Sequence, residues 1–250
     1  MLRDSLGDFL AECWQRWCLK ASIGSGSKRA RAFGKFGPGS LILFPVTTIF
    51  NEKYIHIGSE TMIGEHVALS AGMMPGQVCL TDPVVRIGDR CLIGRGSGIV
   101  GHLSIDIGND VWTGHHVYIT DQSHGYEDVS LPISLQSQPE SPVVIGEGSW
   151  LGHGVVVLPG AKIGKHVAVG ANSVVTGELP DFCVAVGAPA RVIRQYTPES
   201  GWTPQKSNCQ SAPDPPCAEC DWCRNPLRAR AQVHPRCADT ACHESHRPCR

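Results

Sequence analysis

The sequence lacks the features by which several large classes of protein are recognised. Aromatic residues make up only 6% of the 250 residues, and the formal net charge is −1. So small a charge gives no electrostatic reason to expect a nucleic acid partner. No apolar run approaches the roughly 20 residues of a membrane-spanning helix, because the most apolar early run, residues 41–50, is broken by Pro45. The first residues also lack the basic start and apolar block of a signal peptide, so we expect a cytoplasmic protein.

What the sequence has in quantity is glycine, with 28 residues, and a step of six residues between aliphatic positions. A helix repeats every 3.6 residues and a strand every 2, so neither explains this step. The stacked coils of a β-solenoid do, since each hexapeptide supplies a short strand and a corner, with its aliphatic residue pointing into a narrow interior. A glycine often follows the aliphatic residue, and we expect it to let the chain bend without a Cβ clash. The clearest tract contains Ile145, Leu151, Val157, Ile163, Val169 and Val175.

The repeat is interrupted at three places. Residues 70–83 break the rhythm, two residues are added between Ile99 and Ile107, and residues 120–141 form a long polar excursion. Solenoids carry such insertions on one face, which is often the functional face. We therefore look for the functional site among these interruptions.

The segment before the repeats predicts an amphipathic helix that packs on the coils. A role at a membrane surface is the less favoured alternative, because the polar face carries charges of both signs. We place this helix and a lead-in segment in residues 1–54 and the coils in residues 55–196. The expected apolar stripe consists of Leu2, Leu6, Phe9, Leu10, Cys13 and Trp17.

The composition changes at Thr197, after which Pro, Cys, Arg and His dominate and glycine nearly vanishes. The spacing of Cys217, Cys220 and Cys223 resembles that of zinc ligands. However, the segment offers too few apolar positions to build a small core around a metal, and its composition is typical of a disordered tail. We therefore expect residues 197–250 to be disordered and expect no metal.

The tract from Ile145 to Arg194 resembles the maltose and galactoside O-acetyltransferase branch of the hexapeptide-repeat acyltransferases. It reads IGEGSWLGHGVVVLPGAKIGKHVAVGANSVVTGELPDFCVAVGAPARVIR, and it follows that family's pattern without a gap. Weaker repeats extend the likeness over roughly residues 40–196. The resemblance implies an all-β fold, a left-handed parallel β-helix, assembled as a homotrimer with acyl-CoA sites between neighbouring subunits. It also implies transfer of an acetyl group from acetyl-CoA to a hydroxyl of a sugar or related small acceptor.

Acyl transfer to an alcohol needs a base that removes the hydroxyl proton. The candidate is His124 in the long excursion, where the resembling enzymes carry a loop histidine, and an imidazole with a pKa near about 6.5 suits this task. Asp121 or Glu127 could orient the other ring nitrogen, and we also assign both to substrate binding. His102, in the two-residue expansion, could border the acceptor pocket of a neighbouring site.

The resemblance assigns six residues to acetyl-CoA: Trp150, His153, Ala171, Thr176, Arg191 and Arg194. Trp150 matches a tryptophan near the active site, and the next three line the pantetheine arm, partly through backbone groups. The two arginines match basic residues near the nucleotide, whose phosphates attract them. Gly177 departs from the family, which often has Lys or Arg there, so one expected phosphate contact is weakened.

Two alternatives to an acetyltransferase stay open. A γ-type carbonic anhydrase uses the same solenoid but needs three histidines on a zinc ion across an interface. A catalytically silent solenoid would serve as a scaffold. Residues 33–51 also replace much of the segment that shapes the sugar pocket of the resembling enzymes, so the acceptor stays open, as does acetyl against a longer acyl donor.

Overall fold

The computed structural model describes residues 2–205, which contain one α-helix, three short 3₁₀ helices and strands in three sheets. The helices are α1 (Leu2–Ala21), η1 (Arg29–Ala32), η2 (Glu52–Tyr54) and η3 (Ile133–Leu135). Sheet A contains β1 (Ile23–Gly24), β3 (Leu41–Ile42), β6 (Met62–Ile63), β9 (Leu92–Ile93), β12 (Trp112–Thr113), β15 (Trp150–Leu151), β18 (Ala168–Val169), β21 (Cys183–Val186), β22 (Arg191–Thr197) and β23 (Gly201–Pro204). Sheet B contains β2 (Lys35–Phe36), β5 (Ile55–Ile57), β8 (Val85–Ile87), β11 (Ile105–Ile107), β14 (Val143–Ile145), β17 (Lys162–Ile163) and β20 (Glu178–Leu179). Sheet C contains β4 (Ile49–Phe50), β7 (Ala68–Ala71), β10 (Gly98–Gly101), β13 (Tyr118–Thr120), β16 (Val156–Val157) and β19 (Val174–Val175).

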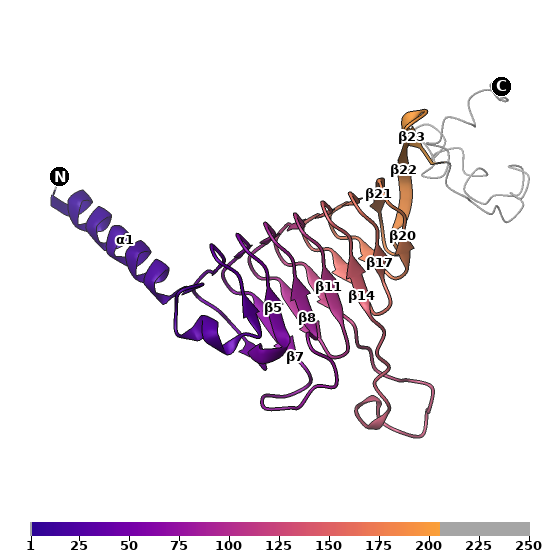
Figure 1. The fold of residues 1–250 in the computed structure, drawn as a ribbon, viewed down its shortest axis with the longest axis horizontal. Coiled ribbons are helices and arrows are strands. Elements are labelled where there is room, and N and C mark those ends of the chain that lie inside the picture. Colours follow the sequence, from indigo (N-terminus) through magenta and orange to yellow (C-terminus); the bar gives the residue numbers. More distant parts are fainter. Residues whose placement is uncertain (1, 206–250) are drawn as a thin grey trace, which may run out of the picture. The chain divides into compact units, whose positions relative to one another are not determined.

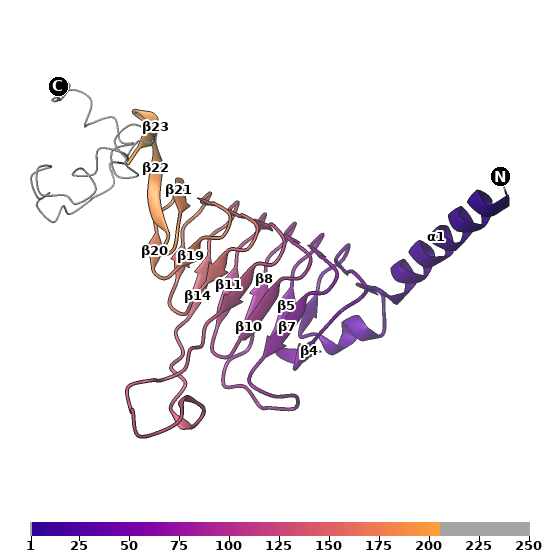
Figure 2. The ribbon, with the colours of Figure 1, turned by 180° about the vertical axis from the view of Figure 1, so that it is seen from behind.

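From β2 onwards the chain visits sheets B, A and C in turn, so that each sheet gains one parallel strand per coil. Figures 1 and 2 show the resulting stack of coils. The residues of the six-residue step lie inside, and all six in the clearest tract are at most 2% exposed. The predicted strand-rich coils with a continuous aliphatic interior are therefore confirmed.

The glycines that follow these aliphatic residues are required for a different reason from the one predicted. Gly152 does not have the positive φ that only glycine adopts easily, but a Cβ on it would lie 2.6 Å from the backbone nitrogen of Ala171 in the next coil. The bend itself falls two residues later in this coil, at Gly154, whose φ is +68°. The residue equivalent to Gly154 in the preceding coil is His116, with a φ of +57°. The repeat glycines therefore allow adjacent coils to approach each other.

Helix α1 forms as predicted, but its apolar side chains do not pack on the coils. Phe9, Leu10 and Trp14 are 58% to 60% exposed, and the aromatic contact with the coil region joins the Trp17 and Phe44 rings at 4.8 Å between centroids. The expected packing of this helix is thus corrected. No helix in residues 2–205 is long and apolar enough to cross a membrane.

Strands also lie outside the expected bounds of the coils, residues 55 and 196. Strands β2, β3 and β4 already form one coil before residue 55, because they pair in register with β5, β6 and β7. At the other end, β22 and β23 form an antiparallel hairpin on sheet A that continues to Pro204. The cysteine-rich segment from residue 206 and its zinc-like spacing lie outside the described residues.

Candidate active site

Both long insertions leave the solenoid at the corner between sheets C and B, which we call the C–B edge. One joins β7 to β8 and the other joins β13 to β14. Figures 1 and 2 show both loops projecting from this side of the stack. His102 lies at the same edge, in the coil between the two loops. The interruptions in the repeat therefore gather at one edge, as the sequence predicted.

The loop that carries His124 begins as a two-stranded ribbon. The Ser123 N–H donates to the Pro139 carbonyl at 3.0 Å, and the Gly125 N–H donates to the Ser137 carbonyl at 2.7 Å. His124 lies between these two bonds and its residue is exposed. A hydrogen-bonded ribbon thus holds His124, and its imidazole is accessible to an incoming substrate.

Asp121 fixes this ribbon to the coil below it. The residue is 0% exposed, and its Oδ1 accepts the His102 N–H at 2.8 Å. Its Oδ2 accepts the N–H groups of Leu103 at 2.8 Å and of Ser104 at 2.7 Å. The Asp121 carbonyl also accepts the Ser141 N–H at 2.8 Å, where the ribbon returns. Both carboxylate oxygens are therefore engaged by backbone, and the expected contact from Asp121 to His124 is not formed in this structure.

His102 faces the base of the same ribbon. Its side chain is only 7% exposed, and its Nδ1 lies 3.7 Å from the Glu140 Oε1. Glu140 in turn forms the bridge with Gln122, two residues before His124. His102 and His124 are therefore both attached to one ribbon.

Glu127 lies farther out in the loop. Its Oε2 accepts the Tyr126 N–H at 3.1 Å, and the residue is exposed. Within residues 2–205, no hydrogen bond joins His124 to Glu127 or to Asp121. The role of Glu127 stays a prediction.

The residues assigned to acetyl-CoA lie mostly on other parts of the triangle. Trp150 is 49% exposed on the outer face of sheet A, and Arg191 and Arg194 lie on β22 at the end of that sheet. His153 and Ala171 stack in successive coils at the corner between sheets A and C, the A–C edge. There the Asn172 N–H donates to the His153 carbonyl at 2.8 Å.

Among the predicted acetyl-CoA residues, only Thr176 lies at the C–B edge with His124. Sheet C separates that edge from His153 and Ala171. One chain alone therefore does not bring the predicted base and most of the predicted donor-binding residues together.

Sequence reasoning missed a second tryptophan. Trp112 pairs with Trp150 in register on neighbouring strands of sheet A, and the two residues are 56% and 49% exposed. The signal was available, because the segments VWTG and SWLG occupy equivalent places in successive coils.

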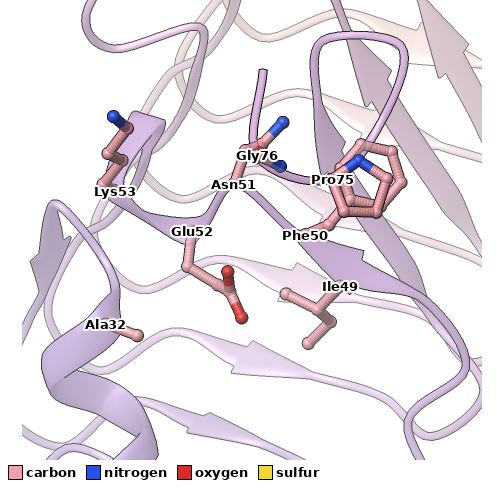
Figure 3. Close-up of a pocket in the computed structure, with 8 residues that line it drawn as sticks. All are labelled: Ala32, Ile49, Phe50, Asn51, Glu52, Lys53, Pro75 and Gly76. Carbon is pink, nitrogen blue, oxygen red and sulfur yellow. The ribbon is translucent and has the colours of Figure 1, made fainter. Parts of the chain in front are cut away.

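A cavity of about 470 Å³ opens at the C–B edge, two coils before His102. Figure 3 shows the carboxylate of Glu52 between Ala32 and Ile49, with Phe50 and Pro75 on one side. Asn51 fixes the wall of the cavity, since it donates to the Ala71 carbonyl at 2.6 Å and its Oδ1 accepts the Gly76 N–H at 2.7 Å. This cavity was not foreseen because the loop of residues 72–83 that borders it shows no repeat.

A thiol also lies in the loop of residues 72–83. Burial raises the pKa of the Cys79 thiol, and the neighbouring Lys53 only partly opposes this effect. A neutral thiol is a weak nucleophile, so Cys79 is a poor candidate for carrying the acyl group. Residues 2–205 bring no three His, Cys, Asp or Glu side chains together as a metal site.

Comparison with known proteins finds hexapeptide repeats in two tracts of the chain. The family described as "Bacterial transferase hexapeptide (six repeats)" matches residues 142–177, and that described as "Hexapeptide repeat of succinyl-transferase" matches residues 84–120. Two tracts of the chain therefore match models of the hexapeptide repeat. The resemblance inferred from the tract at 145–194 is thereby confirmed, since galactoside O-acetyltransferases are among the relatives.

Two relatives and one solved structure illustrate the extent of the likeness. A Mycobacterium tuberculosis protein named a probable acetyltransferase is 36% identical over 57% of this chain and 42% of its own length. The Escherichia coli galactoside O-acetyltransferase is 32% identical over 57% of each chain. A mutant of AntD, an N-acyltransferase from Bacillus cereus solved with dTDP and coenzyme A, shares the fold with a TM-score of 0.57 at 20% identity, over 71% of this chain and 94% of its own. The chain spans about half the length of the curated relatives it matches.

Proposed function

We propose that this protein is an O-acyltransferase that moves an acetyl group from acetyl-CoA to a hydroxyl of a sugar or related small acceptor. The observation that carries the proposal is His124, an exposed imidazole on a ribbon that Asp121 fixes to hexapeptide coils. Relatives named galactoside O-acetyltransferase support both the donor and the acceptor class.

His124 acts as the general base in this proposal. Its neutral imidazole takes the proton of the acceptor hydroxyl while the oxygen attacks the thioester carbonyl carbon. The tetrahedral intermediate then collapses, the carbon–sulfur bond breaks, and the imidazolium returns the proton to the leaving thiolate of CoA. Histidine can both take up and release a proton near neutral pH, so one side chain can serve in both steps.

We further propose that the active site is assembled between subunits of a homotrimer of left-handed coils. This arrangement is supported by the separation of His124 from Trp150 and His153 within one chain. The outer face of sheet A is apolar and exposed, with Met62 at 42%, Trp112 at 56% and Trp150 at 49%. Such a face is typical of a subunit interface. A neighbouring subunit would then bring its donor-binding residues to the C–B edge of the first.

The cavity at Glu52 is our candidate for binding the acceptor. It opens at the same edge as His102 and His124, and the Glu52 carboxylate can accept hydrogen bonds from hydroxyl groups. Phe50 supplies an aromatic wall of the kind that packs against an apolar ring face. All five cysteines in residues 2–205 are free thiols, which fits the reducing cytoplasm that we propose as the location.

The test is release of free thiol from acetyl-CoA in the presence of a panel of sugars. We expect turnover by the native protein and a loss of roughly 10²-fold or more in His124→Ala, the scale of losing a general base. His166→Asn is the matched control, because His166 is an exposed histidine at a different edge and Asn tolerates its positive φ of 55°. Undiminished turnover in His124→Ala would contradict the assignment, and zinc-dependent CO₂ hydration would favour the anhydrase instead.

A further inference from the structure

Helix α1 presents an apolar face that the rest of the described chain leaves uncovered. Leu6, Phe9, Leu10, Trp14 and Trp17 are each between 51% and 60% exposed. A helix turns by about 100° per residue, so these five side chains fall on one face of α1. An exposed apolar patch of this kind is typical of a site that binds another protein, a membrane or a ligand.

The charged residues of α1 have defined places around this face. Arg16 falls on the border of the apolar face and Lys20 falls within it at the end of the helix, while Asp8 falls on the opposite side. Glu12 also lies away from the apolar face and forms an ion pair with Arg16 at 2.6 Å. A lysine at the end of such a helix can reach lipid phosphates while its stem covers apolar surface, and Asp8 on the opposite side stays in water.

The apolar residues themselves favour a lipid surface over a second protein helix. Three of the five are aromatic, and tryptophan is enriched where an apolar phase meets water. A helix–helix seam prefers Leu, Ile and Val at its buried positions and has charges of both signs along both borders. In α1 the acidic residues Asp8 and Glu12 lie away from the apolar face.

We propose that α1 lies flat in the surface of an anionic lipid bilayer, with Leu6, Phe9, Leu10, Trp14 and Trp17 inserted among the acyl chains. The helix does not span the bilayer in this arrangement. It holds the coils next to the membrane through the short segment after Ala21. The proposal rests on α1 alone and is independent of the reaction proposed above.

The test is co-sedimentation of the full chain with vesicles of equal amounts of phosphatidylcholine and phosphatidylglycerol. We expect the native protein to sediment with the vesicles and Leu10→Glu to bind at least about tenfold more weakly, because a charge replaces a leucine that would insert among the acyl chains. Leu19→Glu is the matched control. It makes the same change on the same helix, at a leucine that is 63% exposed but lies on the side of Asp8.

Two further measurements make the result decisive. Trp14→Ala introduces a strong helix former, so the helicity measured by circular dichroism should not fall. This variant should also bind the vesicles more weakly. Vesicles of phosphatidylcholine alone should bind the native protein more weakly, since Lys20 then lacks anionic lipid partners. The proposal is overturned if the native protein stays in the supernatant, or if Leu10→Glu and Leu19→Glu bind alike. It is also overturned if Leu10→Glu leaves vesicle binding unchanged but lowers the mass by light scattering, since a second copy then covers the face.

Discussion

The two edges that border sheet C differ in what they carry, although the same aliphatic interior lies behind both. At the A–C edge the corners are short and alike, as in residues 94–97, 114–117 and 152–155. At the C–B edge the corners include the loops of residues 72–83 and 121–142. The comparison shows that the stacking of the coils depends on the aliphatic interior and not on the corners. The corners of one edge can therefore accept insertions. The regular edge can then act mainly through its backbone, and the irregular edge supplies the side-chain chemistry.

The first prediction concerns the carboxylate that fixes the irregular edge. In Asp121→Asn one oxygen becomes an NH₂ group that faces backbone N–H donors, so at least one charge-assisted hydrogen bond is lost. We expect kcat to fall by about tenfold or more while the KM for acetyl-CoA changes little, because Asp121 positions the His124 ribbon and the His102 turn. Steady-state kinetics at several acetyl-CoA concentrations measure both quantities.

A matched control separates positioning from general stability. Asp89 also holds a neighbouring coil, but only its Oδ1 accepts a backbone bond, from the Ser59 N–H at 2.7 Å. An amide keeps that bond, and the corner lies between sheets B and A, away from both loops. Asp89→Asn should therefore retain kcat. If kcat falls in both variants in proportion to the decrease in their melting temperatures, Asp121 has no special role at the irregular edge.

The second prediction asks whether the two edges meet only between subunits. Trp112→Glu places a charge on the apolar outer face of sheet A, and we expect loss of the proposed trimer together with most of the activity. Val144→Glu is the control on sheet B, where Val144 is 41% exposed and pairs in register with Lys162. Light scattering reports the mass of each variant. A Trp112→Glu protein that stays trimeric would show that this face is not the interface.

Most of the scaffold could be predicted from sequence, because burial follows the repeat. Every aliphatic residue from Ile145 to Val175 in the six-residue step is buried, and the breaks in the step mark the loops. The use of Asp121 could not be predicted, since its partners stand 17 to 19 residues earlier and become neighbours only when coils stack. The position of α1 was missed for a related reason. An apolar stripe identifies the face of a helix that needs a partner but does not say which partner.

The role of the repeat glycines gives the third prediction, on the regular edge. In Gly152→Ala the new Cβ meets the Ala171 backbone of the next coil at 2.6 Å, and backbone there cannot move aside cheaply. We expect a loss of about 1–3 kcal/mol in the free energy of unfolding, the usual cost of overpacking. Gly177→Ala, at the C–B edge, has nothing within 4 Å of its Cβ and should be nearly neutral. Equal loss in both variants, measured by denaturant unfolding, would mean that conformational freedom and not close approach selects glycine.

The smallest effect should be at His153, and it tests whether the regular edge works through its backbone. The His153 carbonyl already accepts the Asn172 N–H from the next coil, and its exposed ring approaches His116 at 5.5 Å between centroids. Removing the ring in His153→Ala leaves the backbone groups that could meet the pantetheine arm. We therefore expect the KM for acetyl-CoA to rise by no more than about threefold, less than 1 kcal/mol, with kcat unchanged. A fall in kcat comparable to that of His124→Ala would place side-chain chemistry at the regular edge, and the distinction between the two edges would then be lost.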